Sequence, residues 1–146
     1  MIYGTLQDAN TYFSSRMYTT AWDRATIQTQ RKALAQATRI IDRLNFIGIK
    51  TVSTQELQFP RGGDTTVPSD ICSATYEIAL ALLDGRDPER ERTNLSVQSQ
   101  GFSGVRTTYN HATASDHILA GVPSYTAWTF LKPYLEDGES IELRRA

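Results

Sequence analysis

Residues with the chemistry of an active site are few in this sequence, and three short motifs contain most of them. The segment Gly101-Phe102-Ser103-Gly104-Val105 lacks the glycine that a hydrolase turn requires two residues after its nucleophilic serine. The segment Arg61-Gly62-Gly63-Asp64 has glycines but lacks the lysine and Ser/Thr of a phosphate-binding loop. His111 and His117, with Asp116 beside the second, fall short of the three or four ligands of a usual metal site. We therefore expect no enzyme, no metal centre and no cofactor.

The chain has one cysteine, Cys72, so an intrachain disulfide is excluded and a reducing compartment is favoured. Cys72 lies in an apolar helical pattern, which is more typical of a small buried side chain than of a nucleophile. No stretch approaches the roughly 18 apolar residues of a membrane span, and Met1-Ile2-Tyr3-Gly4 lacks the basic start of a signal peptide. We expect no membrane partner and no export.

Charge is divided unevenly along the 146 residues, although the formal net charge is only −1. Residues 1–50 have a balance of +4 and residues 51–146 a balance of −5. With a hydrophobic fraction of 40%, this composition is typical neither of a strongly basic nucleic-acid binder nor of a disordered chain. Halves of opposite charge suit contacts between copies of the chain.

Hydrophobic periodicity predicts helices over residues 6–15, 27–45 and 69–84, a further helix start at Thr20, and a last helix after Ser124. We expect Gly48 to end the helix over 27–45 and Gly85 to end the helix over 69–84. The last helix should have an apolar side made of Tyr125, Trp128, Leu131 and Leu135. Trp22 is expected to contact the core.

Four cations of the helix over 27–45 lie mostly off its apolar stripe: Arg31, Lys32, Arg39 and Arg43. Such a face meets nucleic acid or an acidic partner, or is simply solvated. Glu77 is the only acid in the middle turns of the helix over 69–84. We expect Glu77 to form a salt bridge between helices or between subunits.

The region after residue 86 has a different composition. Ser, Thr, Gln and β-branched residues predict two short strands near 95–99 and 104–109, followed by a polar loop over 110–121. A two-stranded hairpin needs helices or another chain to pack on. Residues 136–146 form an acidic tail that frays or binds a partner. The predicted fold is mainly α, with about four helices, a short β-hairpin and an extended C-terminal arm. The expected domain is 1–135, with an insertion over 95–121 and the tail over 136–146.

The order and spacing of several short segments resemble a known family over residues 5–135. These segments are Leu6…Ala9-x-x-Tyr12-Phe13 with Trp22, Ala33-Leu34…Ala37-Thr38-x-x-Ile41-Asp42, Phe46…Gly48-x-Lys50, Leu57-x-Phe59-Pro60-Arg61, Val67-Pro68-x-x-Ile71, Glu77-Ile78-Ala79, the Gly/Ser-rich strand segment through Tyr109, and Pro123…Trp128…Leu131-x-Pro133-Tyr134-Leu135. In this respect the chain is similar to the head–tail connector proteins of tailed phages, also called adaptor or head-completion proteins.

The resemblance implies a structural virion protein that forms a ring, typically a dodecamer, on the portal and joins it to the next neck or tail component. Double-stranded DNA would pass through the ring without specific binding, and the protein would reside at the head–tail interface of the virion. The resemblance also implies a portal-binding arm and a set of interface or structural residues. The arm would comprise Ile141, Glu142, Leu143, Arg144 and Arg145. The interface or structural residues would be Phe59, Pro60, Arg61, Phe102, Val105 and Tyr109.

The alternative is a replication accessory protein that binds single-stranded nucleic acid, because sequences of this kind are sometimes labelled as similar to the primosomal DnaT protein. That protein would use the basic face of residues 31–43 with Tyr and Trp side chains for stacking. The balance of −5 over residues 51–146 weighs against it.

Overall fold

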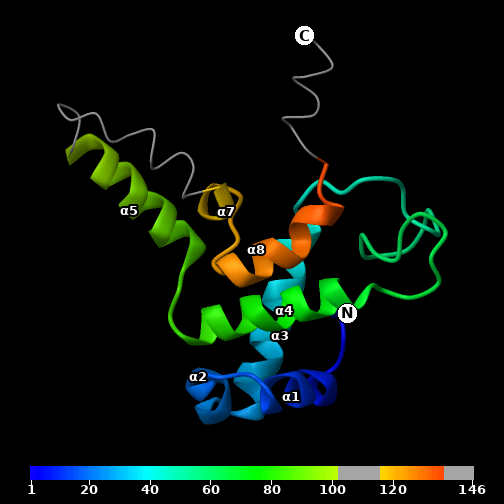
Figure 1. The fold of residues 1–146 in the computed structure, drawn as a ribbon, viewed down its shortest axis with the longest axis horizontal. Coiled ribbons are helices and arrows are strands. Elements are labelled where there is room, and N and C mark those ends of the chain that lie inside the picture. Colours follow the sequence, from blue (N-terminus) through cyan, green and yellow to red (C-terminus); the bar gives the residue numbers. More distant parts are fainter. Residues whose placement is uncertain (102–115, 137–146) are drawn as a thin grey trace, which may run out of the picture.

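The computed structural model describes residues 1–101 and 116–136, which form seven α-helices and one 3₁₀-helix (Figure 1). In chain order these are α1 (Leu6–Ser14), α2 (Thr20–Arg24), α3 (Ile27–Asp42), α4 (Ser69–Leu83), α5 (Pro88–Gly101), α7 (Asp116–Leu119), α8 (Tyr125–Leu131) and η1 (Lys132–Tyr134). Over these two ranges there is no strand, and the β-type pairing consists of two isolated bridges, Phe46–Leu135 and Lys50–Arg61. The expectation of a mainly α protein is confirmed.

Side-chain caps fix where three of the helices begin. The Thr5 hydroxyl accepts a hydrogen bond from the Asp8 N–H at 3.0 Å before α1, and the Thr26 hydroxyl accepts one from the Thr29 N–H at 3.2 Å before α3. Ser124 caps α8 by accepting from the N–H of Ala127 at 3.1 Å. Each cap satisfies an N–H that has no partner within its helix.

Helix α4 lies at the centre of the described structure (Figure 1). It packs against α3 and against α8, and it also contacts α1 and α2. Because it has neighbours on several sides, every residue from Ala74 to Ala81 is buried. A helix that is apolar nearly all round is typical of such a position.

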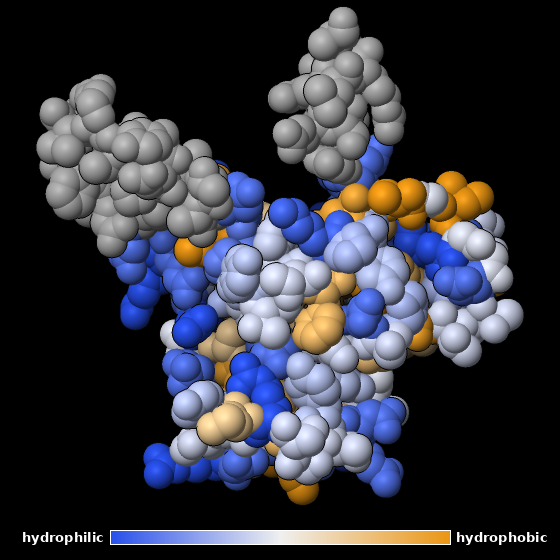
Figure 2. Space-filling model, viewed as in Figure 1, coloured by the Kyte–Doolittle hydropathy of each residue, from blue (hydrophilic) through white to orange (hydrophobic). Residues whose placement is uncertain are grey.

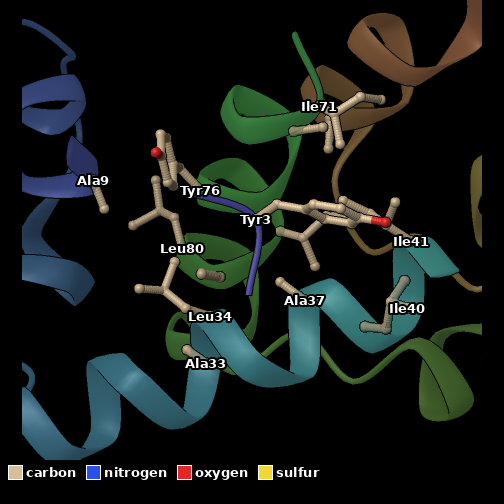
Figure 3. Packing of buried hydrophobic residues seen from close by; sticks show 14 of the residues in the cluster. Tyr3, Ala9, Ala33, Leu34, Ala37, Ile40, Ile41, Ile71, Tyr76 and Leu80 are labelled. Carbon is tan, nitrogen blue, oxygen red and sulfur yellow. The ribbon is translucent and has the colours of Figure 1, made fainter. Parts of the chain in front are cut away.

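The N-terminal segment inserts Tyr3 into the core between α3 and α4 (Figure 3). The backbone N–H of Tyr3 donates to the Thr38 hydroxyl, and its own hydroxyl donates to the carboxylate of Asp42. Gly4 follows at a φ of +78°, and a Cβ there would lie 2.1 Å from the hydroxyl oxygen of Tyr76. Only glycine fits this close approach, because both the backbone conformation and the space exclude a side chain.

The connector over residues 45–68 is held to the core by Phe59, which is 4% exposed. The Phe59 ring meets Phe46, Tyr134 and Tyr3 edge-on, with centroids 4.7, 5.9 and 6.1 Å away. These aromatic contacts, together with the Phe46–Leu135 bridge, join the connector to η1 and to the residue that follows it. Exposed aliphatic side chains gather over the start of the connector (Figure 2): Ile47, Ile49 and Val52.

The predicted strand over 95–99 is wrong, because these residues belong to α5. Pro88 blocks the continuation of α4, yet it occupies the first position of α5, where its missing N–H and fixed φ are tolerated. The carboxylate of Asp87 accepts from the N–H of Glu89 at 3.0 Å, and Glu89 and Glu91 are favourable in the first turn. The second predicted strand, 104–109, lies outside the described residues, so a β-hairpin is not shown.

Other boundaries shift by smaller amounts. Helix α3 ends at Asp42, so Gly48, although its φ is +82°, belongs to the connector and does not cap the helix. Gly85 at φ +87° ends α4 as expected. Asp116–Leu119 form α7 within the expected polar loop.

The domain limits of 1–135 and 136–146 stay a prediction. Within the described residues no helix is both long and apolar enough to cross a bilayer.

Buried tyrosines should make the fold sensitive to alkaline pH. Burial, reinforced by hydrogen bonds to carboxylates, raises the pKa of Tyr3 and of Tyr12, and burial raises the pKa of Tyr76 to about 12. In the unfolded chain these groups lose protons near about pH 10. Above that pH the unfolded state binds fewer protons than the folded state, so stability falls as pH rises.

We therefore expect urea unfolding to give a constant free energy up to about pH 9. Above about pH 10 the free energy should fall by about 1.4 kcal/mol per pH unit for each tyrosine that stays protonated in the fold. Tyr76→Phe should make this decline shallower by one tyrosine's share. Equal stability of the parent chain at pH 8 and pH 11 would contradict the prediction.

Candidate nucleic-acid interface

Helix α3 and its C-cap carry an exposed row of side chains that we call the basic stripe: Lys32, Gln36, Arg39 and Arg43. The spacing of four, three and four residues places all of them on one face of the helix. At 1.5 Å per residue the stripe is about 16 Å long. Arg31, also exposed, adds a cation at its edge.

No acidic residue of α3 lies beside the basic stripe. Asp42 is the only acid of α3, and its carboxylate accepts from the Tyr3 hydroxyl and from the N–H of Gln58 at 3.3 Å. These bonds turn Asp42 toward the connector. The stripe can therefore act as a run of positive charge toward a polyanion.

A second feature is a groove of about 450 Å³ between the α1–α2 loop, the end of α4 and the start of α8, which we call the tyrosine groove. Tyr18 and Tyr125 line it and are 85% and 65% exposed. Four charged residues also line it: Arg16, Glu77, Asp84 and Arg86. Exposed tyrosine rings beside cations are the components of a surface on which nucleobases stack.

Glu77 of α4 is the buried charge of the tyrosine groove, with 2% of its side chain exposed. Arg16 binds it in a forked pair, from Nε to Oε2 at 2.7 Å and from Nη2 to Oε1 at 2.9 Å. The Tyr12 hydroxyl donates to the same Oε2 at 2.6 Å. The predicted interhelical salt bridge is confirmed, and it lies within one chain. The pair satisfies a carboxylate that would otherwise be costly to bury.

Arg16 also contacts the backbone directly before Tyr18. Its Nη1 donates to the carbonyl of Met17, the residue directly before Tyr18. Tyr18 has a φ of +61° and is the one non-glycine residue with a positive φ in the described part of the chain. This conformation costs on the order of 1 kcal/mol or more for a bulky residue and is concentrated at functional sites.

The structure places three of the predicted interface or structural residues together in the connector. Phe59 is buried as described, and the Phe59–Pro60 peptide bond is cis. The guanidinium of Arg61 donates to the backbone carbonyls of Phe46, Ile47 and Gly48 and to Gln58. Arg61 therefore joins the two ends of the connector, residues 46–48 and residues 58–61, within one chain. A role of these residues between subunits stays a prediction.

The other predicted site residues lie outside the described residues. These are Phe102, Val105 and Tyr109 of the interface set and Ile141, Glu142, Leu143, Arg144 and Arg145 of the arm.

Among the residues first considered for chemistry, those that the structure describes form no common site. His117 Nδ1 lies 2.8 Å from the Val122 carbonyl oxygen, and its ring packs edge-on against Tyr125. His111 lies outside the described residues. Cys72 is half-buried, and burial raises the pKa of its thiol. Within the described ranges no three residues are placed to hold a metal ion.

Sequence reasoning missed the tyrosine groove. Tyr125 was expected with Leu131 on the apolar side of the last helix. Leu131 is buried as expected, but Tyr125 is exposed, so the expectation for Tyr125 is wrong. Tyr18 belongs to no periodic pattern. Its only signal in the sequence is its position between a helix end and the next helix start.

A small helical fold with an exposed basic stripe and an aromatic groove defines a candidate nucleic-acid-binding protein. Residues 2–146 match the family model described as "Putative DnaT-like ssDNA binding protein". The chain belongs to that family. No curated protein and no solved structure matches it significantly.

This match overturns the identification as a head–tail connector protein, because the family that matches is the DnaT-like one. The inferred portal-bound ring, the neck and tail partners and the unbound passage of double-stranded DNA are corrected with it. A virion location was expected only as part of that identification, and no observation tests it. The match supports the alternative that the basic helix face had suggested.

Removing one partner of the Glu77–Arg16 pair should destabilise the protein. We expect Arg16→Gln to cost about 3 kcal/mol, since it leaves Glu77 buried without its cation, and Glu77→Gln to cost somewhat less, since Arg16 is 30% exposed. The double variant should cost less than the sum of the two by at least about 1 kcal/mol.

Urea unfolding of the four chains in this double-mutant cycle measures that coupling. Arg24→Gln is the matched control, because Arg24 is exposed on α2, and it should change stability by less than about 0.5 kcal/mol. Additive effects at residues 16 and 77 would refute the coupling.

Proposed function

We propose that this protein binds single-stranded DNA and acts by binding, without a catalytic step. The observation that carries the proposal is the match of residues 2–146 to the DnaT-like single-stranded-DNA-binding family. The basic stripe supports it with a row of exposed cations on a rigid helix. Such a row tracks a phosphate backbone without reading its sequence.

Geometry favours the single strand over the duplex. The basic stripe is one helix face about 16 Å long with three cations, which suits a short segment of backbone. A single strand also exposes base faces, which stack on aromatic rings, whereas a duplex hides them. The net charge of −1 limits long-range attraction, so binding depends on this local concentration of cations.

Salt dependence tests the basic stripe. Each phosphate neutralised on a single strand contributes about −0.7 to the slope of log K against log salt concentration. Lys32→Gln/Arg39→Gln/Arg43→Gln should therefore make the slope less steep by about 2 and weaken binding to all sequences alike. Fluorescence anisotropy with a labelled oligo(dT) at several salt concentrations measures this change.

A matched pair of single variants provides the control. Lys32 and Lys132 are both exposed lysines, one on the basic stripe and the other on η1. Lys32→Gln should reduce the slope by about 0.7, and Lys132→Gln should leave it unchanged. Equal effects of the two, or no binding of oligo(dT) by the parent chain at low salt, would refute the proposal.

A further inference from the structure

We infer that the tyrosine groove captures a nucleobase of the bound single strand, with Tyr18 and Tyr125 as its stacking surfaces. The inference rests on the proposed function and adds a second, base-contacting part to the binding surface. It follows from the exposure of the two rings, from how Tyr18 is held, and from the distribution of charge in the groove.

Exposure and backbone conformation both single out Tyr18. The side chain is 85% exposed, so it gains little from burial in the fold, yet its backbone is held in the left-handed region. Arg16 donates to the carbonyl of Met17, directly before Tyr18, and Arg16 is itself bound by Glu77. Residues held in such a backbone conformation cluster at ligand-binding sites, and Tyr18 is such a residue.

Charge decides which part of a nucleotide enters the groove. Glu77 is neutralised by Arg16, but the nearby Asp84 also lines the groove and repels phosphate. An uncharged base is tolerated beside Asp84, whose carboxylate can accept from a base N–H, such as the N3–H of thymine. Arg86 is exposed among the lining residues and can contact the phosphate that stays outside.

The groove lies close to a hollow that includes part of the basic stripe. Gln36 and Arg43 of the stripe line a second hollow, together with Arg92 and residues 118–121. Asp87 and Glu89 also line this hollow, so its cations are partly balanced. Ser124, only three residues after Gly121, lines the tyrosine groove. Because three residues span at most about 11 Å, the Cα atoms of Gly121 in one hollow and Ser124 in the other are no farther apart than that.

The test compares oligo(dT) with an abasic oligonucleotide of the same length, using the full chain and two substitutions at residue 18. Asparagine tolerates the left-handed region, so Tyr18→Asn removes the ring without straining the fold. We expect it to keep or raise Tm, to weaken oligo(dT) binding by about 5- to 100-fold and to leave the salt slope unchanged. Tyr18→Phe keeps the ring and should bind within about twofold of the parent chain.

Two further measurements distinguish stacking from other effects. The parent chain should prefer oligo(dT) over the abasic strand, and Tyr18→Asn should lose that preference. Tyr125→Leu should weaken binding in the same way, while Met17→Ala, a change at an exposed neighbour, should not.

If the parent chain binds oligo(dT) and Tyr18→Asn binds it equally well, the inference is wrong and the proposed function stands. A shallower salt slope in Tyr18→Asn would also overturn it, because the groove would then bind phosphate. No binding by the parent chain would refute the proposed function and the inference together.

Discussion

The constraint on which the rest of the structure depends is the buried carboxylate of Glu77 in the central helix α4. An ionised group at this depth must have partners, and Arg16 and Tyr12 supply them from α1 and the loop that follows it. These bonds fix the N-terminal helix against α4 at one place. They also fix the loop that carries Tyr18, so the same interaction serves the fold and the proposed base-binding groove.

The two parts of the binding surface differ in how the fold supports them. The basic stripe lies on the outer face of α3, whose inner face packs on α4, so its cations are positioned by an ordinary amphipathic helix. The tyrosine groove is assembled from three segments far apart in sequence. It therefore exists only when the α1–α2 loop, α4 and α8 have come together.

This difference explains what the sequence could predict. Helix periodicity and capping residues predicted α1, α3 and α4. The same periodicity predicted that the cations of α3 lie on its solvent-exposed face. Composition misled the prediction over residues 95–99, because β-branched and polar residues there outweighed the helix start at Pro88. The sequence did not predict the role of Tyr18, because the groove beside it is completed by residues far away in the chain, such as Glu77 and Tyr125. The family was also misjudged, since segments shared in order and spacing pointed to a connector protein.

The most direct test of the account is ultraviolet crosslinking of the full chain to oligo(dT), followed by mass mapping of the crosslinked tryptic peptides. A strand bound along the basic stripe and stacked in the tyrosine groove should crosslink to residues 17–24, which contain Tyr18, and to residues 33–43 of the stripe. Crosslinks confined to the connector over residues 45–68, or the absence of any crosslink, would contradict the account.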